Sequence, residues 1–169
     1  MRDVAVGVAG VGRLGREHAR ILADVEGARL VGVHDVDEER GRSVAAAAGV
    51  AFAADLDALL SGCEALVVAV PTAAHHELGR RALAAGLHVL VEKPLAATLE
   101  QADELVALAE ERGTTLAVGH VERFNAAVRS AEPHLDAPRF IESLRLAPFQ
   151  PRGIDVNVVL DLMIHDIDL

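Results

Sequence analysis

Aromatic side chains are almost missing from this sequence: four of its 169 residues are phenylalanine, and none is tryptophan or tyrosine. Apolar residues still make up 51% of the chain, so we expect a substantial core of closely packed Ala, Val and Leu. Cysteine is also scarce. Cys63 is the only one, which excludes an internal disulfide and indicates a reducing compartment; we interpret it as a small residue near the start of a buried strand.

Basic runs interleaved with aromatics are lacking too, and the formal net charge is −10, which excludes a nucleic-acid-binding surface. No apolar stretch reaches the roughly 18 residues that a membrane span needs. The strand pattern starts at Asp3, without a basic and then apolar leader before it. We therefore expect a cytoplasmic protein that binds neither nucleic acid nor membrane, and we expect no metal site. The length allows one domain, or one domain and the beginning of another.

Lysine occurs once, at Lys93, whereas the other 15 of the 16 Lys and Arg residues are arginine. Lys93 follows residues 88–91, a β-branched and aliphatic run that predicts a short buried strand. Open α/β sheets present ligands at the carboxyl ends of their strands, and lysine, unlike arginine, can exchange a proton. Pro94 holds Lys93 extended and makes a cis bond possible. Lys93 is thus a candidate proton-transfer group; the alternative is a surface lysine in a strand-to-helix loop.

A glycine pattern follows the first predicted strand, residues 4–9. The run Gly10-Val11-Gly12-Arg13-Leu14-Gly15 has the spacing G-x-G-x-x-G. We expect Gly10 to allow a tight turn, Gly12 to let backbone approach a pyrophosphate, and Gly15 to let a helix pack against the strand. The phosphates would then lie at the free N–H groups of a helix N-terminus.

Asp35 follows the second predicted strand, residues 29–34, and lies 20 residues after Gly15. Dinucleotide-binding folds place an acid at this position to accept hydrogen bonds from the adenosine ribose. A carboxylate there repels a 2′-phosphate, and Val36 offers no compensating charge, so NAD is favoured over NADP. Arg40 and Arg42, one helical turn further on, weaken this preference.

Strands and helices alternate up to residue 118. The predicted strands occupy residues 4–9, 29–34, 50–53, 65–70, 88–91 and 115–118, and the helices between them end near residues 24, 48, 60, 85 and 112. Pro71 and Thr72 close the fourth strand, and a capping box starts at Thr98. This order predicts an α/β fold, a doubly wound parallel sheet of the Rossmann type with right-handed crossovers.

The pattern changes after residue 118. Polar groups crowd residues 119–125, at the ligand side of the predicted sheet, and prolines at 133 and 138 interrupt the chain. We predict a dinucleotide-binding domain over residues 1–123 and the beginning of an α+β domain over residues 124–169. Residues 140–146 alternate like a half-buried strand, and Asp155 is positioned to cap a helix that runs to the terminus.

That last predicted helix carries a second candidate pair. Asp161 and His165 are four residues apart, so both lie on one helical face. An acid that hydrogen-bonds a histidine ring fixes its tautomer and makes it a better base for removing a proton from an alcohol. The alternative is an acidic helix face with one incidental histidine.

Several segments together carry a resemblance to a known family. They are residues 4–15, residues 67–75, Glu92-Lys93-Pro94, residues 119–125 and residues 161–165. In this order they resemble the Gfo/Idh/MocA oxidoreductases, NAD(P)-dependent enzymes that act mostly on sugars, sugar nucleotides and cyclitols. Residues 119–125 and 161–169 are most similar to its MviM-type branch, which includes UDP-N-acetylglucosamine 3-dehydrogenases.

The resemblance implies roles for individual residues. Lys93 would orient the substrate and assist proton transfer, and His165 would be the general base, with Asp161 as its partner or as a substrate ligand. The other residues that the resemblance assigns are Pro71, Thr72, His75 and Glu92 beside the cofactor, and His120, Arg123 and Asn125, with Lys93 and His165, beside the substrate. At His18, which matches a recurring helix position, packing and function remain equally open.

The resemblance also implies a second sheet that begins near residues 140–146, shapes the substrate pocket and forms the interface of a homo-oligomer. We expect residues 1–169 to bind the dinucleotide and to be a poor catalyst without that sheet. Two functions follow. The first is an NAD-dependent dehydrogenase of a polyhydroxylated substrate, and the second is a nucleotide-binding or regulatory module without turnover.

Overall fold

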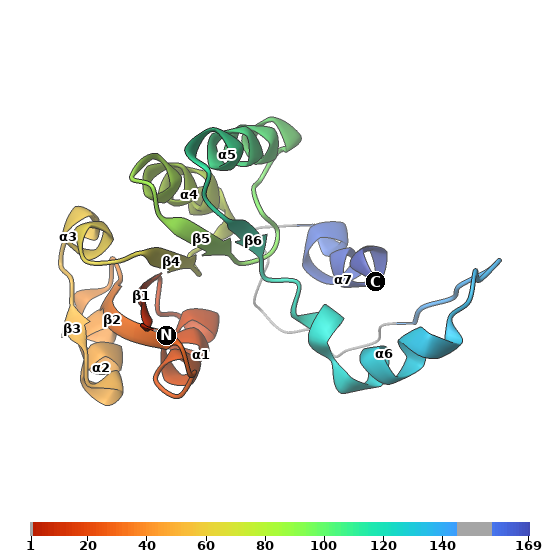
Figure 1. Cartoon of the computed structure of the whole chain (residues 1–169), viewed down its shortest axis with the longest axis horizontal. Helices are drawn as coiled ribbons and strands as arrows, with labels where there is room; N and C mark the ends of the chain where they lie inside the picture. The colour runs from red at the N-terminus through yellow and green to blue at the C-terminus, as the bar shows by residue number, and fades with distance from the viewer. Residues whose placement is uncertain (1, 145–156) are drawn as a thin grey trace. The chain divides into compact units, whose positions relative to one another are not determined.

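The computed structural model describes residues 2–144 and 157–169. Six parallel strands form one sheet in the order β3-β2-β1-β4-β5-β6 (Figure 1). They are β1 (Val4–Ala9), β2 (Ala28–His34), β3 (Ala51–Phe52), β4 (Ala65–Val68), β5 (His88–Val91) and β6 (Leu116–Val118). The chain builds outward from β1 in one direction and then, from β4, in the other. The predicted doubly wound parallel sheet is therefore confirmed.

Helices cover both faces of this sheet. They are α1 (Arg13–Leu22) and α2 (Glu38–Ala48) on one face, and α3 (Leu56–Ser61), α4 (His75–Ala84) and α5 (Leu99–Arg112) on the other (Figure 1). Within residues 2–144 and 157–169, no helix combines the length and the apolar character that a membrane crossing requires.

Local sequence explains where the longer helices begin and end. The side chain of Asp37 accepts a hydrogen bond from the backbone N–H of Arg40 and caps α2, and Thr98 caps α5 in the same way through the N–H of Gln101. Both helices end at a glycine in the left-handed region, Gly49 with φ +67° and Gly113 with φ +63°. These caps match the boundaries that the sequence predicts.

The core consists of two clusters, one on each face of the sheet. Successive residues of β4 enter different clusters: Leu66 and Val68 pack under α3, α4 and α5, whereas Val67 faces α1 and α2. This alternation follows from the two-residue period of a strand. The largest fully buried apolar side chains are Leu66, Leu83, Leu105, Val8, Val11, Val33, Val68 and Val91. A core of closely packed aliphatic residues is what the shortage of aromatics predicts.

The chain divides into two compact units, Met1–Val118 and Gly119–Leu169. The division falls five residues before the predicted domain boundary, and the role of each domain stays a prediction. The second unit contains η2 (Val121–Phe124), α6 (Ala126–Ala131) and η3 (Glu132–His134), and then η4 (Val159–Met163) and α7 (Ile164–Asp168). The segment η4 is a stretch of wider π-type turns that continues into α7.

One predicted element of the second unit differs from the structure. Residues 140–144 form no strand, and the rest of the predicted strand, residues 145 and 146, lies outside the described residues. A strand needs neighbours for its N–H and C=O groups, and no described segment pairs with residues 140–144. Instead the Ser143 hydroxyl donates to Asp166, 3.0 Å away. The predicted cap at Asp155 also lies outside the described residues.

Candidate functional site

The glycine turn after β1 combines two crowded positions with one open position. Gly10 has φ +82°, and a Cβ there would lie 2.7 Å from the carbonyl oxygen of Ala69. A Cβ on Gly15 would lie 1.8 Å from the carbonyl oxygen of Gly10, so only glycine lets α1 approach the turn this closely. At Gly12 nothing lies within 4 Å of that position, which leaves its backbone accessible to a ligand.

Helix α1 starts at this turn without a side-chain cap. Gly12 provides no side-chain cap, the first turn holds no acidic residue, and Arg13 and Leu14 are both exposed. The first N–H groups of a helix have no partner within the helix, and its dipole favours negative charge there. The turn therefore fits a pyrophosphate group, which Gly12 would allow to approach and α1 would stabilise.

Asp35 is buried at the end of β2 and is tied directly to the glycine turn. Its Oδ2 accepts the backbone N–H of Val11 at 2.8 Å, and its Oδ1 accepts the N–H of Asp37 at 2.9 Å. Arg40 adds a two-pronged contact, with Nη2 2.7 Å from Oδ1 and Nε 3.1 Å from Oδ2. Burial by itself would raise the pKa of Asp35, but the hydrogen bonds from Arg40, Asp37 and Val11 outweigh it and lower that pKa. Asp35 is thus a carboxylate at neutral pH.

His75 joins the segment after β4 to the loop after β5, which contains Lys93 and Pro94. This side chain is 1% exposed, with Nδ1 2.7 Å from the carbonyl oxygen of Pro94 and Nε2 2.8 Å from that of Val70. Pro71 and Thr72 lie between Val70 and His75 in the sequence, at the start of η1 (Thr72–Ala74). His75 therefore links the ends of β4 and β5 through main-chain atoms, and its contact with a cofactor stays a prediction.

Glu92, Lys93 and Pro94 follow β5, at the carboxyl edge of the sheet. The Lys93–Pro94 bond is cis, as the sequence suggested. Glu92 is buried, and its Oε1 lies 2.7 Å from His18 Nε2 on α1. Its Oε2 accepts the backbone N–H of Lys93 at 3.3 Å. His18, which the sequence left open between packing and function, therefore holds the carboxylate next to Lys93.

The predicted substrate residues of the second unit bind other residues of the same unit. Arg123 binds both carboxylate oxygens of Asp168 at 2.7 Å, and His120 Nδ1 lies 3.5 Å from the same group. The hydrogen bond from Arg123 lowers the pKa of Asp168. Asn125 caps α6 by accepting the N–H of Ala127 at 3.0 Å, and it donates to Glu122. The sequence reasoning missed Asp168, although its place in the acidic terminal helix was a signal.

Asp161 and His165 lie in the last helical segment, and both are half-buried. The sequence argument assumed an α-helix, whereas Asp161 lies in the wider turns of η4 and His165 at the start of α7. Four residues remain close to one full turn in either geometry, so the shared face is retained. Lys93 belongs to the first unit and this pair to the second.

The strand order 3-2-1-4-5-6, the glycine turn at a helix N-terminus and the buried acid after β2 define a Rossmann-type dinucleotide-binding domain. The chain belongs to the Gfo/Idh/MocA family: the family model, described as an oxidoreductase family with an NAD-binding Rossmann fold, matches residues 4–120. The resemblance noted from the sequence is confirmed.

Among curated relatives, UDP-N-acetylglucosamine 3-dehydrogenase of Acidithiobacillus ferrooxidans is 42% identical over 170 residues, which cover 100% of this chain and 54% of the relative. Inositol 2-dehydrogenase 1 of Saccharopolyspora erythraea is 43% identical over 140 residues, 79% of this chain and 42% of the relative. The chain thus spans about half the length of these relatives.

Solved structures are also similar to this chain. That of UDP-N-acetylglucosamine 3-dehydrogenase GnnA from Acidithiobacillus ferrooxidans has a TM-score of 0.93 and 41% identity, over 99% of this chain and 55% of that one. GenD2 from gentamicin A biosynthesis, solved in complex with NAD, has a TM-score of 0.76 and 35% identity, over 80% of this chain and 40% of its own.

Proposed function

We propose that this chain is the dinucleotide-binding part of a dehydrogenase that oxidises a hydroxyl group of a sugar, sugar nucleotide or cyclitol. The observation that carries the proposal is the joined site of the first unit, where the Val11 N–H connects the open glycine turn to buried Asp35. A bound nicotinamide cofactor would supply the hydride chemistry. The protein would supply the phosphate turn, the ribose acceptor and the groups that move a proton.

The proposed substrate class rests on the relatives. One is named for the 3-position of UDP-N-acetylglucosamine and another for the 2-position of inositol, so both act on a secondary alcohol of a polyhydroxylated ring. The chain spans about half of their length. We propose that the protein also assembles as a homo-oligomer. Light scattering would measure the assembly, and a screen of sugar nucleotides and cyclitols for NAD reduction would find the substrate.

We assign the proton path to Lys93 and His165, with Asp161 as the partner of His165. His165 would take the hydroxyl proton while Lys93 orients the substrate oxygen, and His120, Arg123 and Asn125 would bind the rest of the substrate. In a turnover-competent form of the protein, Lys93→Ala and His165→Ala should each lower kcat by on the order of 10²–10⁴ and leave dinucleotide binding near wild type. Normal turnover in either variant would remove that residue from the mechanism.

We also propose that the site prefers NAD to NADP, because buried Asp35 accepts ribose hydroxyls and repels a 2′-phosphate. Fluorescence titration of NADH and NADPH measures this preference, which Asp35→Ser should narrow. Tighter binding of NADPH by the wild type would contradict the argument.

Gly12→Ala tests the phosphate turn itself. A methyl group at this position meets nothing within 4 Å, so stability should be unchanged, yet it would occupy the approach of the pyrophosphate. We expect NADH affinity to fall by about tenfold or more. Gly62→Ala is a matched control, with φ −95° and its nearest neighbour 3.6 Å away, outside the turn. Unchanged NADH affinity in Gly12→Ala would place the phosphates elsewhere.

A second candidate function is a dinucleotide-binding module without turnover. It is favoured by the second unit, where Gly119 is the only buried residue among those that the structure describes. Such a unit would hold His165 with little packing support, and a displacement of about 1 Å can cost two orders of magnitude in rate. NADH binding without turnover on any substrate of the screen would favour this module; turnover would exclude it.

A further inference from the structure

The carboxylate of Asp35 has no acceptor site left for a ribose. A carboxylate offers about four lone-pair positions, two on each oxygen. Here Oδ1 accepts from the Asp37 N–H and from Arg40, and Oδ2 accepts from the Val11 N–H and from Arg40. Two of the four donors are main-chain groups of the turn and of the loop before α2. Only the side chain of Arg40 can leave without moving the backbone.

Arg40 also lies beside the expected position of a 2′-phosphate, because it contacts both Asp35 and Asp37. Its Nη1 is 3.1 Å from Asp37, its side chain is 39% exposed, and neighbouring Val36 is uncharged and 93% exposed. A guanidinium binds a phosphate as readily as a carboxylate, through the same planar pair of N–H donors. A 2′-phosphate would therefore replace Asp35 as the partner of Arg40.

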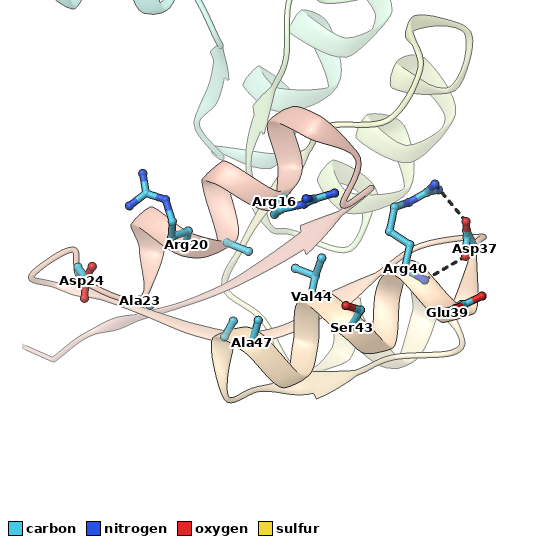
Figure 2. A pocket seen from close by; sticks show the side chains of 12 residues that line it. Arg16, Arg20, Ala23, Asp24, Asp37, Glu39, Arg40, Ser43, Val44 and Ala47 are labelled. Carbon is cyan, nitrogen blue, oxygen red and sulfur yellow. Dashed lines mark hydrogen bonds and ion pairs between the residues drawn. The ribbon is translucent and has the colours of Figure 1, made fainter.

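The surroundings give Arg40 room to move. A cavity of about 770 Å³ lies between α1 and α2, and Arg40 and Asp37 line it together with Arg16, Arg20, Ser43 and Val44 (Figure 2). Figure 2 shows Arg40 reaching across to Asp37 at one end of this cavity. The guanidinium can thus leave Asp35 without displacing another side chain of the core.

We propose that Arg40 determines the cofactor choice of this site. It competes with the ribose hydroxyls of NAD for Asp35, and it binds the 2′-phosphate of NADP. This inference rests on the proposed function, since it presupposes that the dinucleotide binds at the glycine turn. Its consequence is that the wild-type preference for NAD over NADP is smaller than the buried acid by itself would give.

The proposal predicts that Arg40→Ala moves the two affinities in opposite directions. NADH should bind a few-fold more tightly, because its ribose no longer competes with Arg40, and NADPH should bind about tenfold more weakly, because a charge-assisted contact is lost. Arg40→Lys keeps the charge but loses the planar pair of donors, so it should restore only part of the NADPH affinity. Titration of both cofactors by fluorescence measures this, with thermal unfolding of the free variants as the check on folding.

Arg42→Ala is the matched control. Arg42 lies on the same helix, so its substitution removes the same charge. Its guanidinium, however, pairs with Glu38 at 3.0 Å and lies over the Phe52 ring. Both affinities should stay within about twofold of wild type. If wild type binds neither cofactor, the proposed function fails and this inference with it. If wild type binds NADH while Arg40→Ala changes both affinities in the same direction, or neither, the role of Arg40 alone is overturned.

Discussion

The two units of this chain are stabilised by different forces. All the buried apolar side chains that the structure describes lie in the first unit, between Ala5 and Ala109. The second unit leaves many large apolar side chains exposed, among them Phe124 at 75% and Phe140 at 80%. Its specific described contacts are polar, and the pair formed by Arg123 and Asp168 is the closest of them.

This difference determines how each unit should respond to change. Burial of apolar surface contributes about 25 cal/mol per Å² and depends little on pH or salt. Exposed ion pairs contribute little and are weakened by salt. The first unit should therefore unfold as one cooperative body, and the second should respond to local electrostatic changes. Three experiments test whether the two units differ in this way.

The largest effect should come from Leu105→Ala. This side chain lies on α5 and is fully buried against α4 and the sheet, so its truncation should destabilise the first unit by about 3 kcal/mol. Phe124→Ala in the second unit, at an exposed position, should cost less than about 0.5 kcal/mol. Denaturant unfolding measures both. Equal costs would show that the second unit also has a buried core.

Cys63 offers an independent readout of the first unit in that experiment. Its thiol is half-buried and donates to the carbonyl oxygen of Leu59, and burial raises its pKa to about 11. The native thiol should therefore react slowly with alkylating reagents at neutral pH. Labelling should accelerate in Leu105→Ala and stay at the wild-type rate in Phe124→Ala.

A smaller effect should separate two helix caps of the same chemistry. Thr98 caps α5, which packs on the core, and Asn125 caps α6, in which no residue is buried. Thr98→Ala should lower the global stability by about 1 kcal/mol. Asn125→Ala should leave it unchanged and only accelerate amide exchange in α6, because α6 contributes little to the cooperative core. A global loss in both variants would mean that the two units unfold together.

The smallest effect concerns acid. The hydrogen bond from Arg123 places the folded-state pKa of Asp168 below its ordinary value of 3.8, so this pair stabilises the second unit above that value. The contribution is lost as the pH falls through the lowered pKa, where the carboxylate takes up a proton. Amide exchange in α7 should then accelerate a few-fold relative to the core strands. Asp168→Asn should show the faster exchange already at neutral pH, and equal protection across the whole pH range would contradict the assignment.

Individual residues show how far sequence reasoning reached. The spacing of Gly10, Gly12 and Gly15 predicts a turn whose crowding and openness the structure displays, because each glycine answers a local backbone requirement. Arg40 shows the limit. Its distance from Asp35 along the chain suggested a weak influence, whereas its two-pronged contact with both carboxylate oxygens exists only in the folded helix.

The second unit was harder to predict for the same reason. The strand predicted for residues 140–146 rested on a partial alternation in hydropathy, but a strand also needs a neighbouring strand, and such a pattern says nothing about whether one is present. The first unit shows the same limit, because His18 and Glu92 are 74 residues apart and no local pattern could pair them.

The amino-acid sequence was enough to predict the order of strands and helices along the chain, the phosphate turn and the family, because periodicity, caps and glycine spacing act over a few residues. Only the tertiary structure decided which groups already occupy Asp35, that His75 joins the ends of β4 and β5, and that Asp168 is the partner of Arg123. Such contacts depend on side chains brought within about 3 Å from distant positions, and hydrogen-bond energy falls steeply beyond that separation.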